Sequence, residues 1–245
     1  MDSTFLLAVA VDTLGRENVL AATAVAPFFP AREAVAARLR AERLGVELVE
    51  VEARQLSRPE FVANPPYRCY HCKAMLLADL TALAAERGMA LATGSHVGDR
   101  DDYRPGARAE AEAGALRPLL EACLTKPEIR AAARAMGLDC WDQPSLACLA
   151  SRIPYGQRIT PERLRRIDRG EELLVALGFA ACRVRDHDGL ARIEVPSADV
   201  PRLLEHRERI VEVLRGLGFA YVTADLQGLR SGSMNETLPE ANRER

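Results

Sequence analysis

Apolar stretches alternate with amphipathic stretches over residues 5 to 140, and this alternation predicts strands and helices in turn. Continuous runs of β-branched and small apolar residues are typical of buried strands, whereas apolar residues spaced three and four apart indicate helices. The predicted strands cover 19–26, 46–53 and 90–95. The predicted helices cover 5–14, 31–44, 73–88 and 125–138. Repeated strand–helix units of this length predict an α/β fold with a parallel sheet covered by helices.

The pattern changes in the last third of the chain. A helix over 160–178, a hairpin over 181–195, a helix over 199–217 and a strand over 219–226 are predicted there. The pair Asp188-Gly189 is typical of a tight hairpin turn. Helix, hairpin, helix and strand in this order predict a smaller α+β domain. We therefore divide the chain into a first domain over 1–157, a second over 158–240 and a frayed tail over 241–245.

Composition gives limits rather than a function. The chain has 245 residues, of which 48% are hydrophobic and 28% are charged, as in an ordinary soluble protein. A net charge of -2 gives no reason to expect nucleic acid or a membrane surface as a partner. No apolar run approaches the ~20 residues of a spanning helix, and Leu6–Val11 lacks the basic flank of a signal peptide. We expect a cytoplasmic protein whose six cysteines are reduced, metal-bound or reactive.

The first residues raise the question of a phosphate site. Asp2, Ser3 and Thr4 are helix-capping residues that directly precede a run of apolar residues. The N-terminus of a helix can bind phosphate, but neither a strand nor a glycine turn precedes this one. These residues alone favour a plain helix cap.

Cys69 and Cys72 form a Cys-x-x-C motif in the stretch RCYHCK. Two thiolates at this spacing can hold a metal ion or an iron–sulfur cluster, or can act as a redox pair. A second such motif, which a zinc site would favour, does not occur in the sequence. Two simply packed thiols remain the alternative.

Cys148 supplies a third thiol, among small residues and ahead of Arg152, whose charge favours the thiolate. Three cysteines would leave one iron of a four-iron cluster without a protein ligand, and an exogenous sulfide can bind there. Cys140 is the rival third ligand. Cys123 and Cys182 lie on patterned segments and are expected in the core.

Two further stretches have charges that suit anionic ligands. Aspartates after the predicted strand over 90–95 could hold Mg²⁺ on a nucleotide, although a solvated acidic loop is the alternative. Arg183 and Arg185 point to the same face of a predicted strand, with Arg192 on its partner. Like charges on one face repel unless an anion lies between them, so a phosphate or carboxylate pocket is one interpretation of these arginines. An exposed strand face that carries arginines is an equally good one. Arg230 and Ser231 lie in a glycine-rich loop that could serve the same anion.

Taken in order, the stretches RCYHCK, DYRPG, ACLASRIPYG, RVRDHDGLARIE and GLRSGSMNE resemble the LarE family, over residues 2 to about 238. These are ATP-dependent sulfur transferases in biosynthesis of the nickel-pincer cofactor of lactate racemase. The resemblance implies an adenine nucleotide α-hydrolase-like (PP-loop) domain with a parallel sheet, followed by a smaller α+β domain. It also implies a homo-oligomer.

The resemblance implies a definite reaction. ATP, with Mg²⁺, adenylylates a carboxylate of pyridinium-3,5-biscarboxylic acid mononucleotide, and a sulfur nucleophile then displaces AMP to give a thiocarboxylate. Some members use one cysteine as a sacrificial donor, which becomes dehydroalanine. Members with three cysteines resemble cluster-dependent thiolases that hold [4Fe-4S] and take sulfide or another sulfur donor. Cys69, Cys72 and Cys148 place this chain with the cluster type.

The family's functional residues are carried over position by position. ATP binding falls to Asp2, Ser3, Asp99 and Asp102; catalysis to Cys148, Ser151 and Arg152; and substrate binding to Arg183, Arg185, Glu194, Arg230 and Ser231. This chain has Gly-Ser-His-Val where the family has an Asp-Gly-x-Asn-like stretch, which weakens the assignment of Asp99 and Asp102.

The family's pyrophosphate loop has the pattern Ser-Gly-Gly-x-Asp-Ser, of which Met1-Asp2-Ser3 matches only the last three positions. The resemblance therefore changes our interpretation of these residues from a plain cap to part of a phosphate site. A start codon placed inside the loop is one explanation, and a truncated, non-catalytic cluster-binding paralogue is the other. For the 245-residue product we expect little ATP-dependent turnover. A PP-loop thiolase acting on tRNA is a further alternative, against which the missing basic patch counts.

Overall fold

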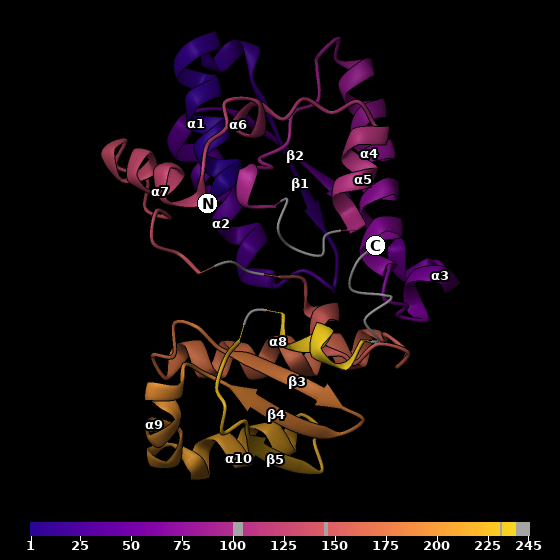
Figure 1. Cartoon of the computed structure of the whole chain (residues 1–245), viewed down its shortest axis with the longest axis vertical. Helices are drawn as coiled ribbons and strands as arrows, with labels where there is room; N and C mark the ends of the chain where they lie inside the picture. The colour runs from indigo at the N-terminus through magenta and orange to yellow at the C-terminus, as the bar shows by residue number, and fades with distance from the viewer. Residues whose placement is uncertain (100–104, 145–146, 231, 239–245) are drawn as a thin grey trace.

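The computed structural model describes residues 1–99, 105–144, 147–230 and 232–238, and Figure 1 shows two groups of elements along its long axis. The first group contains a parallel pair of strands with helices around it. The second group contains a three-stranded sheet with helices on it. The chain is therefore a mixed α/β protein with a parallel sheet, as the sequence predicts.

The parallel pair in the first group is a strand–helix–strand unit. Strand β1 (Leu20–Val25) runs parallel to β2 (Glu47–Glu52), in register from Leu20 opposite Glu47 to Val25 opposite Glu52. Helix α2 (Ala31–Leu44) connects them and ends at Gly45, whose φ of 68° is the left-handed conformation that glycine adopts without strain. These three elements confirm the predictions for residues 19 to 53.

Further helices surround this unit: α1 (Asp2–Leu14), α3 (Pro59–Val62), α4 (Arg68–Glu86), α5 (Pro105–Glu112), α6 (Pro118–Glu121) and α7 (Lys126–Ala135). Helix α4 begins five residues before the predicted start at Lys73, so it includes both cysteines of the Cys-x-x-C motif. None of the helices over the described part of the chain is long and apolar enough to cross a membrane.

The strand predicted over 90–95 does not form a ladder. A single parallel bridge joins Ala92 to Leu116, with N–H groups of Thr93 and Leu116 donating across it. The next donor along the partner segment falls at Pro118, which has no N–H, so the pairing stops after one step. The prediction of a strand was wrong because it took no account of the partner segment.

The second group consists of helix α8 (Pro161–Ala176), strands β3 (Arg183–His187), β4 (Leu190–Glu194) and β5 (Tyr221–Ala224), and helices α9 (Val200–Glu205) and α10 (Arg207–Gly216). Strands β3 and β4 form the predicted antiparallel hairpin, and β5 lies parallel to β4. Asp188 and Gly189 both have positive φ, 54° and 91°, as the tight turn requires. The one helix predicted over 199–217 is two helices that meet at His206, whose N–H bonds three residues back to Leu203.

Helix α8 packs against both groups of elements. Leu174 belongs to an apolar cluster with Phe179 and residues of β3, β4 and α10. Leu164 and Ile167, nearer its N-terminus, belong to another cluster with Phe28, Phe61 and Leu149. A boundary close to residue 157 stays a prediction, but the residues of α8 hold the two groups together.

Candidate functional site

Cys148 lies at the start of a short, well-anchored turn. It caps the 3₁₀ turn η4 (Leu149–Arg152), and the N–H of Leu149 donates to the carbonyl of Phe28 at 2.8 Å. Leu149 and Ala150 are fully buried in the cluster beside α8. Because the apolar residues hold the turn, Cys148 is kept half-buried at its edge.

The structure brings the three predicted ligand cysteines together. Cys69 and Cys72 lie in the first turns of α4, and Cys72 packs against the same apolar cluster as Cys148. Cys148 is close enough to both of them to raise the pKa of each of their thiols. The rival candidate, Cys140, is fully buried and belongs to the segment after α7.

Burial disfavours the thiolate form of Cys69 and Cys72. It raises the pKa of Cys72 to about 12, and the neighbouring Cys148 and Cys69 raise it too, while Lys73 and Arg68 oppose them. The pKa of Cys69 is also raised, first by loss of hydration at the thiol, although the residue as a whole is exposed. Without a bound cation Cys72 stays protonated at neutral pH, so binding a metal there would release protons.

No three or more histidine, cysteine or carboxylate side chains in the described ranges are arranged around a single metal ion. A four-iron cluster binds each thiolate through a different iron and so accepts ligands that stand further apart. Three thiols in an apolar surrounding suit such a cluster better than they suit zinc, which takes four ligands. The donors present are therefore of the kind that a four-iron cluster takes.

The two cysteines expected in the core differ. Cys182 is buried, as predicted. Cys123 is exposed and has a φ of 55°, because it ends the short helix α6 in a left-handed turn. The prediction for Cys123 was wrong, since the helical pattern around it covers only one turn.

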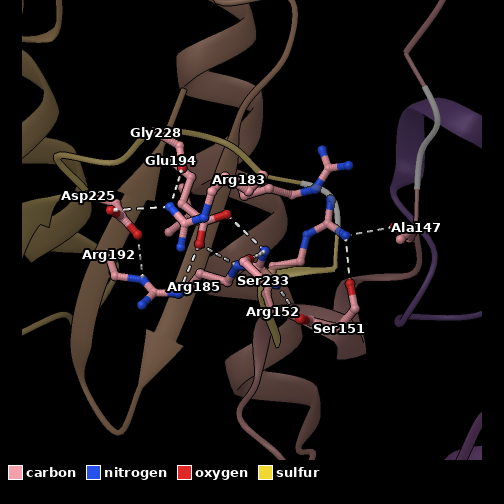
Figure 2. A network of polar contacts seen from close by, with 12 residues as sticks. Ala147, Ser151, Arg152, Arg183, Arg185, Arg192, Glu194, Asp225, Gly228 and Ser233 are labelled. Atoms are coloured by element: carbon pink, nitrogen blue, oxygen red, sulfur yellow. Dashed lines mark hydrogen bonds and ion pairs between the residues drawn. The ribbon is translucent and has the colours of Figure 1, made fainter. Parts of the chain in front are cut away.

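Arg152 holds the turn that contains Cys148. Its guanidinium is fully buried and forms a two-point ion pair with Glu171 of α8, with Nε–Oε1 at 2.7 Å and Nη2–Oε2 at 3.0 Å. Its Nη1 donates to the carbonyl of Ala147 at 2.8 Å and to Ser151 Oγ at 2.9 Å (Figure 2), and also to the carbonyl of Cys148 at 3.2 Å. The described contacts of Arg152 thus fix the backbone on both sides of the cysteine.

Arg185 connects the same turn to the second sheet. Its Nε and Nη2 pair with the buried carboxylate of Glu194 at 2.9 and 2.8 Å, and its Nη1 donates to the carbonyl of Ser151 at 2.7 Å. Arg192 lies opposite Arg185 in the hairpin and donates to Glu194 Oε1 at 2.9 Å. The anion that the arginine pattern requires between these two residues is therefore Glu194 itself, as Figure 2 shows.

Arg183 lies opposite Glu194 in the hairpin, but its side chain extends towards Arg152 (Figure 2). Both guanidinium groups lie on the side of the network that faces Ala147 (Figure 2). Burial lowers the pKa of Arg183 to about 10, and the positive charge of Arg152 lowers it further. Two neighbouring guanidinium groups therefore lie beside the turn of Cys148, and the carboxylate of Glu171 is paired with one of them.

The C-terminal segment closes one side of this network. Arg230 pairs with Glu236 at 3.2 Å and donates to the carbonyl of Gly228 at 3.3 Å. Ser233, in the turn η6 (Ser233–Thr237), is buried and accepts a hydrogen bond from Arg185 Nη2 at 2.8 Å. Ser231 lies outside the described residues.

The predicted ATP-binding residues lie at the start of α1. Lys126 Nζ contacts both carboxylate oxygens of Asp2, at 2.7 and 2.6 Å, while Ser3 is exposed. Gly94 packs against this end, where an added Cβ would lie 2.8 Å from the Ser3 nitrogen. Asp99 ends the 3₁₀ turn η3 (Val97–Asp99), and Asp102 lies outside the described residues.

Sequence reasoning missed three residues of this site. Glu171 is the buried partner of Arg152, Ser233 is a buried partner of Arg185, and Arg68 is buried directly before Cys69. A charged residue on the apolar face of a predicted helix was the available signal for Glu171, because Leu174 lies one turn further on that face. No comparable pattern marks Ser233.

Comparison with known proteins identifies relatives of this chain. No family profile matches the chain. A pyridinium-3,5-bisthiocarboxylic acid mononucleotide synthase of Lactiplantibacillus plantarum is 39% identical over 242 residues, which are 98% of this chain and 88% of that protein. An uncharacterized protein of Synechocystis is 39% identical over 241 residues, 97% of this chain and 90% of that one. An uncharacterized protein of Methanocaldococcus jannaschii is 30% identical over 173 residues, 70% of this chain and 68% of that one.

The fold and the relatives define the class of protein: this chain is a mixed α/β enzyme of the synthase type. More particularly, the chain belongs to the LarE family, the pyridinium-3,5-bisthiocarboxylic acid mononucleotide synthases.

Proposed function

We propose that this chain is an ATP-dependent sulfurtransferase that converts a carboxylate of pyridinium-3,5-biscarboxylic acid mononucleotide into a thiocarboxylate. The observation that carries the proposal is the turn from Ala147 to Arg152. One side of this turn presents Cys148 to Cys69 and Cys72, and the other side is held by buried arginines. A sulfur donor at the cysteines and an anionic substrate at the arginines would therefore lie within a few residues of each other along this turn.

The reaction has two balanced steps. A carboxylate oxygen of the substrate attacks the α-phosphorus of ATP, and pyrophosphate leaves. A sulfur nucleophile then attacks the carbonyl carbon of the acyl adenylate, and the C–O bond to AMP breaks. Activation is needed because a carboxylate is a poor electrophile and oxide is a poor leaving group.

Cys69, Cys72 and Cys148 would hold the [4Fe-4S] cluster, and the iron left without a protein ligand would present an exogenous sulfide as the nucleophile. The apolar cluster behind Cys72 and Cys148 keeps water away from this side of the site. Arg152 and Ser151 keep Cys148 in place through its carbonyl.

The arginine network gives the substrate's phosphate and carboxylates a place to bind. Arg183 adds a positive charge beside Arg152, which contacts the cysteine turn directly. Arg185 and Glu194 are held to each other, so we assign them the role of fixing the strand pair on which Arg183 lies. Arg230 and Ser231 belong to the segment that borders this face.

For ATP, the proposal uses the N-terminus of α1 as the phosphate end of a PP-loop-like site. Asp2 and Ser3 lie there, Lys126 adds a positive charge, and Gly94 allows the following loop to approach closely. Asp99 and Asp102 follow in sequence and are the candidates for Mg²⁺.

Anaerobic reconstitution with iron and sulfide tests the cluster. Wild type is expected to take up about four irons per chain, and Cys69→Ala, Cys72→Ala and Cys148→Ala to lose them. Cys123→Ala, which changes an exposed cysteine elsewhere, is the matched control and is expected to keep the cluster. Iron counting and electron paramagnetic resonance are the readouts.

Other outcomes would change the proposal in stated ways. A wild type without iron, or a cluster indifferent to Cys148→Ala, would overturn the cluster mechanism. Conversion of Cys148 to dehydroalanine during turnover, seen by mass spectrometry, would then show a sacrificial donor. Release of pyrophosphate from ATP that does not depend on the substrate would overturn the activation step itself.

A further inference from the structure

Arg68 is a buried cation whose donors are not all used. Its side chain is 2% exposed, at the first residue of α4. Its guanidinium carbon lies 4.8 Å from the centre of the Tyr155 ring. Nε and Nη1 of Arg68 are both buried and have no hydrogen-bond partner in the described parts of the chain.

A guanidinium in this situation is costly for the folded protein. Taking a charge out of water costs several kcal/mol by general estimates unless an opposite charge or hydrogen bonds compensate it. Buried arginines elsewhere in this chain follow that rule, since Arg152 and Arg185 each form a two-point pair with a glutamate. Arg68 has a ring face beside it instead, which leaves two donors for a ligand.

The surroundings of Arg68 indicate which ligand. Cys69 is the next residue, and Cys72 follows one turn later on the same face of α4. The charge of Arg68 lowers the pKa of both thiols, so the three groups share one electrostatic surrounding.

A buried acceptor lies in the same region. The amide nitrogen of Gln55 donates to the carbonyl of Cys72 at 3.1 Å, while its oxygen Oε1 is buried with no hydrogen-bond partner in the described residues. Gln55 is 1% exposed. The region thus has two unused donors and one unused acceptor around the Cys-x-x-C motif.

Tyr155 keeps Arg68 in this position. The Tyr155 hydroxyl donates to Asn235 Oδ1 at 3.0 Å, which connects its ring to the C-terminal segment. The guanidinium therefore packs against a ring that is itself anchored, and it stays buried.

We propose that Arg68 binds the sulfur to be transferred, as a hydrosulfide anion, through its Nε–H and Nη1–H beside Cys69 and Cys72. Hydrosulfide is small and accepts hydrogen bonds at sulfur. Its one S–H can donate to an acceptor such as Gln55 Oε1, which chloride cannot do. The proposal rests on the proposed function, and it names the residue that selects and orients the anionic sulfur.

The first test is binding of sodium hydrosulfide to the metal-free chain, by anaerobic calorimetry. Arg68→Gln is expected to weaken binding about ten- to hundredfold, the range for losing charge-assisted hydrogen bonds. Arg68→Lys keeps the positive charge but lacks the planar guanidinium. Its affinity for hydrosulfide is therefore expected to lie between those of wild type and Arg68→Gln. Arg108→Gln is the matched control, because Arg108 also stacks on a tyrosine, at 4.9 Å, but is exposed and paired with Glu112.

A second measurement separates an anion site from a purely structural arginine. If Arg68 is a buried charge that only a bound anion compensates, Arg68→Met should raise the melting temperature of the metal-free chain measured without sulfide. A lower melting temperature together with unchanged hydrosulfide binding would overturn the proposal and leave stacking on Tyr155 as its role. Equal binding to wild type and Arg68→Gln, or equal binding of chloride and hydrosulfide, would also overturn it.

The two proposals can fail separately. One outcome is that wild type takes up iron normally and Arg68→Gln retains as much sulfide as wild type. This outcome would contradict the proposal for Arg68 and leave the sulfurtransferase proposal unchanged. No iron uptake by wild type, with hydrosulfide binding that depends on Arg68, would do the reverse.

Discussion

Single charged residues determine how the candidate site is held, and Glu171 is the clearest case. Its carboxylate is fully buried, pairs with Arg152 at two points, and accepts from the backbone N–H of Val184 at 3.2 Å. One side chain of α8 thereby fixes both the cysteine turn and strand β3. Loss of its charge affects two elements at once.

We predict that Glu171→Gln lowers the free energy of unfolding by about 3–5 kcal/mol, because the fully buried Arg152 is left without a counter-charge. Urea unfolding followed by circular dichroism measures this. Glu172→Gln, at the next position and in an exposed pair with Arg169, is the control and should change stability by less than about 0.5 kcal/mol. Equal effects of the two substitutions would contradict the assignment.

The buried thiol of Cys182 makes the free energy of unfolding depend on pH. Burial raises the pKa of this thiol from 9.0 to about 11, and the neighbouring Glu171 adds to the shift. The folded state therefore keeps the proton longer than the unfolded state does. The contribution is fully present below about pH 9 and is lost as the pH rises towards 11.

The Cys182→Ser variant checks this effect, since a hydroxyl does not ionise in that range. Between pH 8.5 and 11 wild type should lose about 2–3 kcal/mol more stability than the variant. Parallel stability curves for the two proteins over this range would count against a neutral, buried thiol.

At the scale of elements, a local cap sets where helix α7 begins. In α7 the carboxylate of Glu128 accepts from the N–H of Thr125 at 2.8 Å and from its hydroxyl at 2.7 Å. The helix then buries Ile129 and Ala133 completely. The cap thus aligns a helix whose buried face, with Ile129 and Ala133, forms one core cluster with Phe5 of α1.

We expect Thr125→Ala to cost about 1 kcal/mol of stability, the usual value of a helix N-cap. Thr13→Ala, at an exposed position in the last turn of α1, is the control, and it should be neutral or slightly stabilising because alanine favours helix. Thermal unfolding distinguishes the two. No difference between them would show that packing alone sets the start of α7.

Across the whole molecule, close contacts between distant segments shape the predicted nucleotide end. Gly94 lies against the first turn of α1, where an added Cβ would be 2.8 Å from the Ser3 nitrogen and 3.0 Å from the Asp2 carbonyl carbon. Both neighbours are backbone atoms, which cannot move aside as a side chain does.

Gly94→Ala should therefore destabilise the fold by about 1–3 kcal/mol, the usual cost of overpacking. Gly216→Ala is the control, because an added Cβ there meets nothing within 4 Å; it should raise stability by about 0.5–1 kcal/mol, as alanine does in a helix. If Gly94→Ala unfolds at the same urea concentration as wild type, the loop does not pack against α1 as described.

The sequence by itself determined features whose causes lie within a few residues. Gly45, Asp188 and Gly189 stop or turn the chain through their own backbone preferences, and Thr125 with Glu128 begins a helix through contacts three residues apart. The strand–helix–strand unit followed from periodicity. The family followed from short ordered motifs and was confirmed by the relatives.

Tertiary structure alone decided how charges are matched, because each partner comes from another element. Arginine spacing in β3 predicted an anion, but only packing shows that Glu194 meets Arg185 and Arg192. The predicted strand over 90–95 failed because its partner segment reaches Pro118. No pattern in the sequence marks Arg68, and its buried, unused donors arise only where α4 packs against Tyr155.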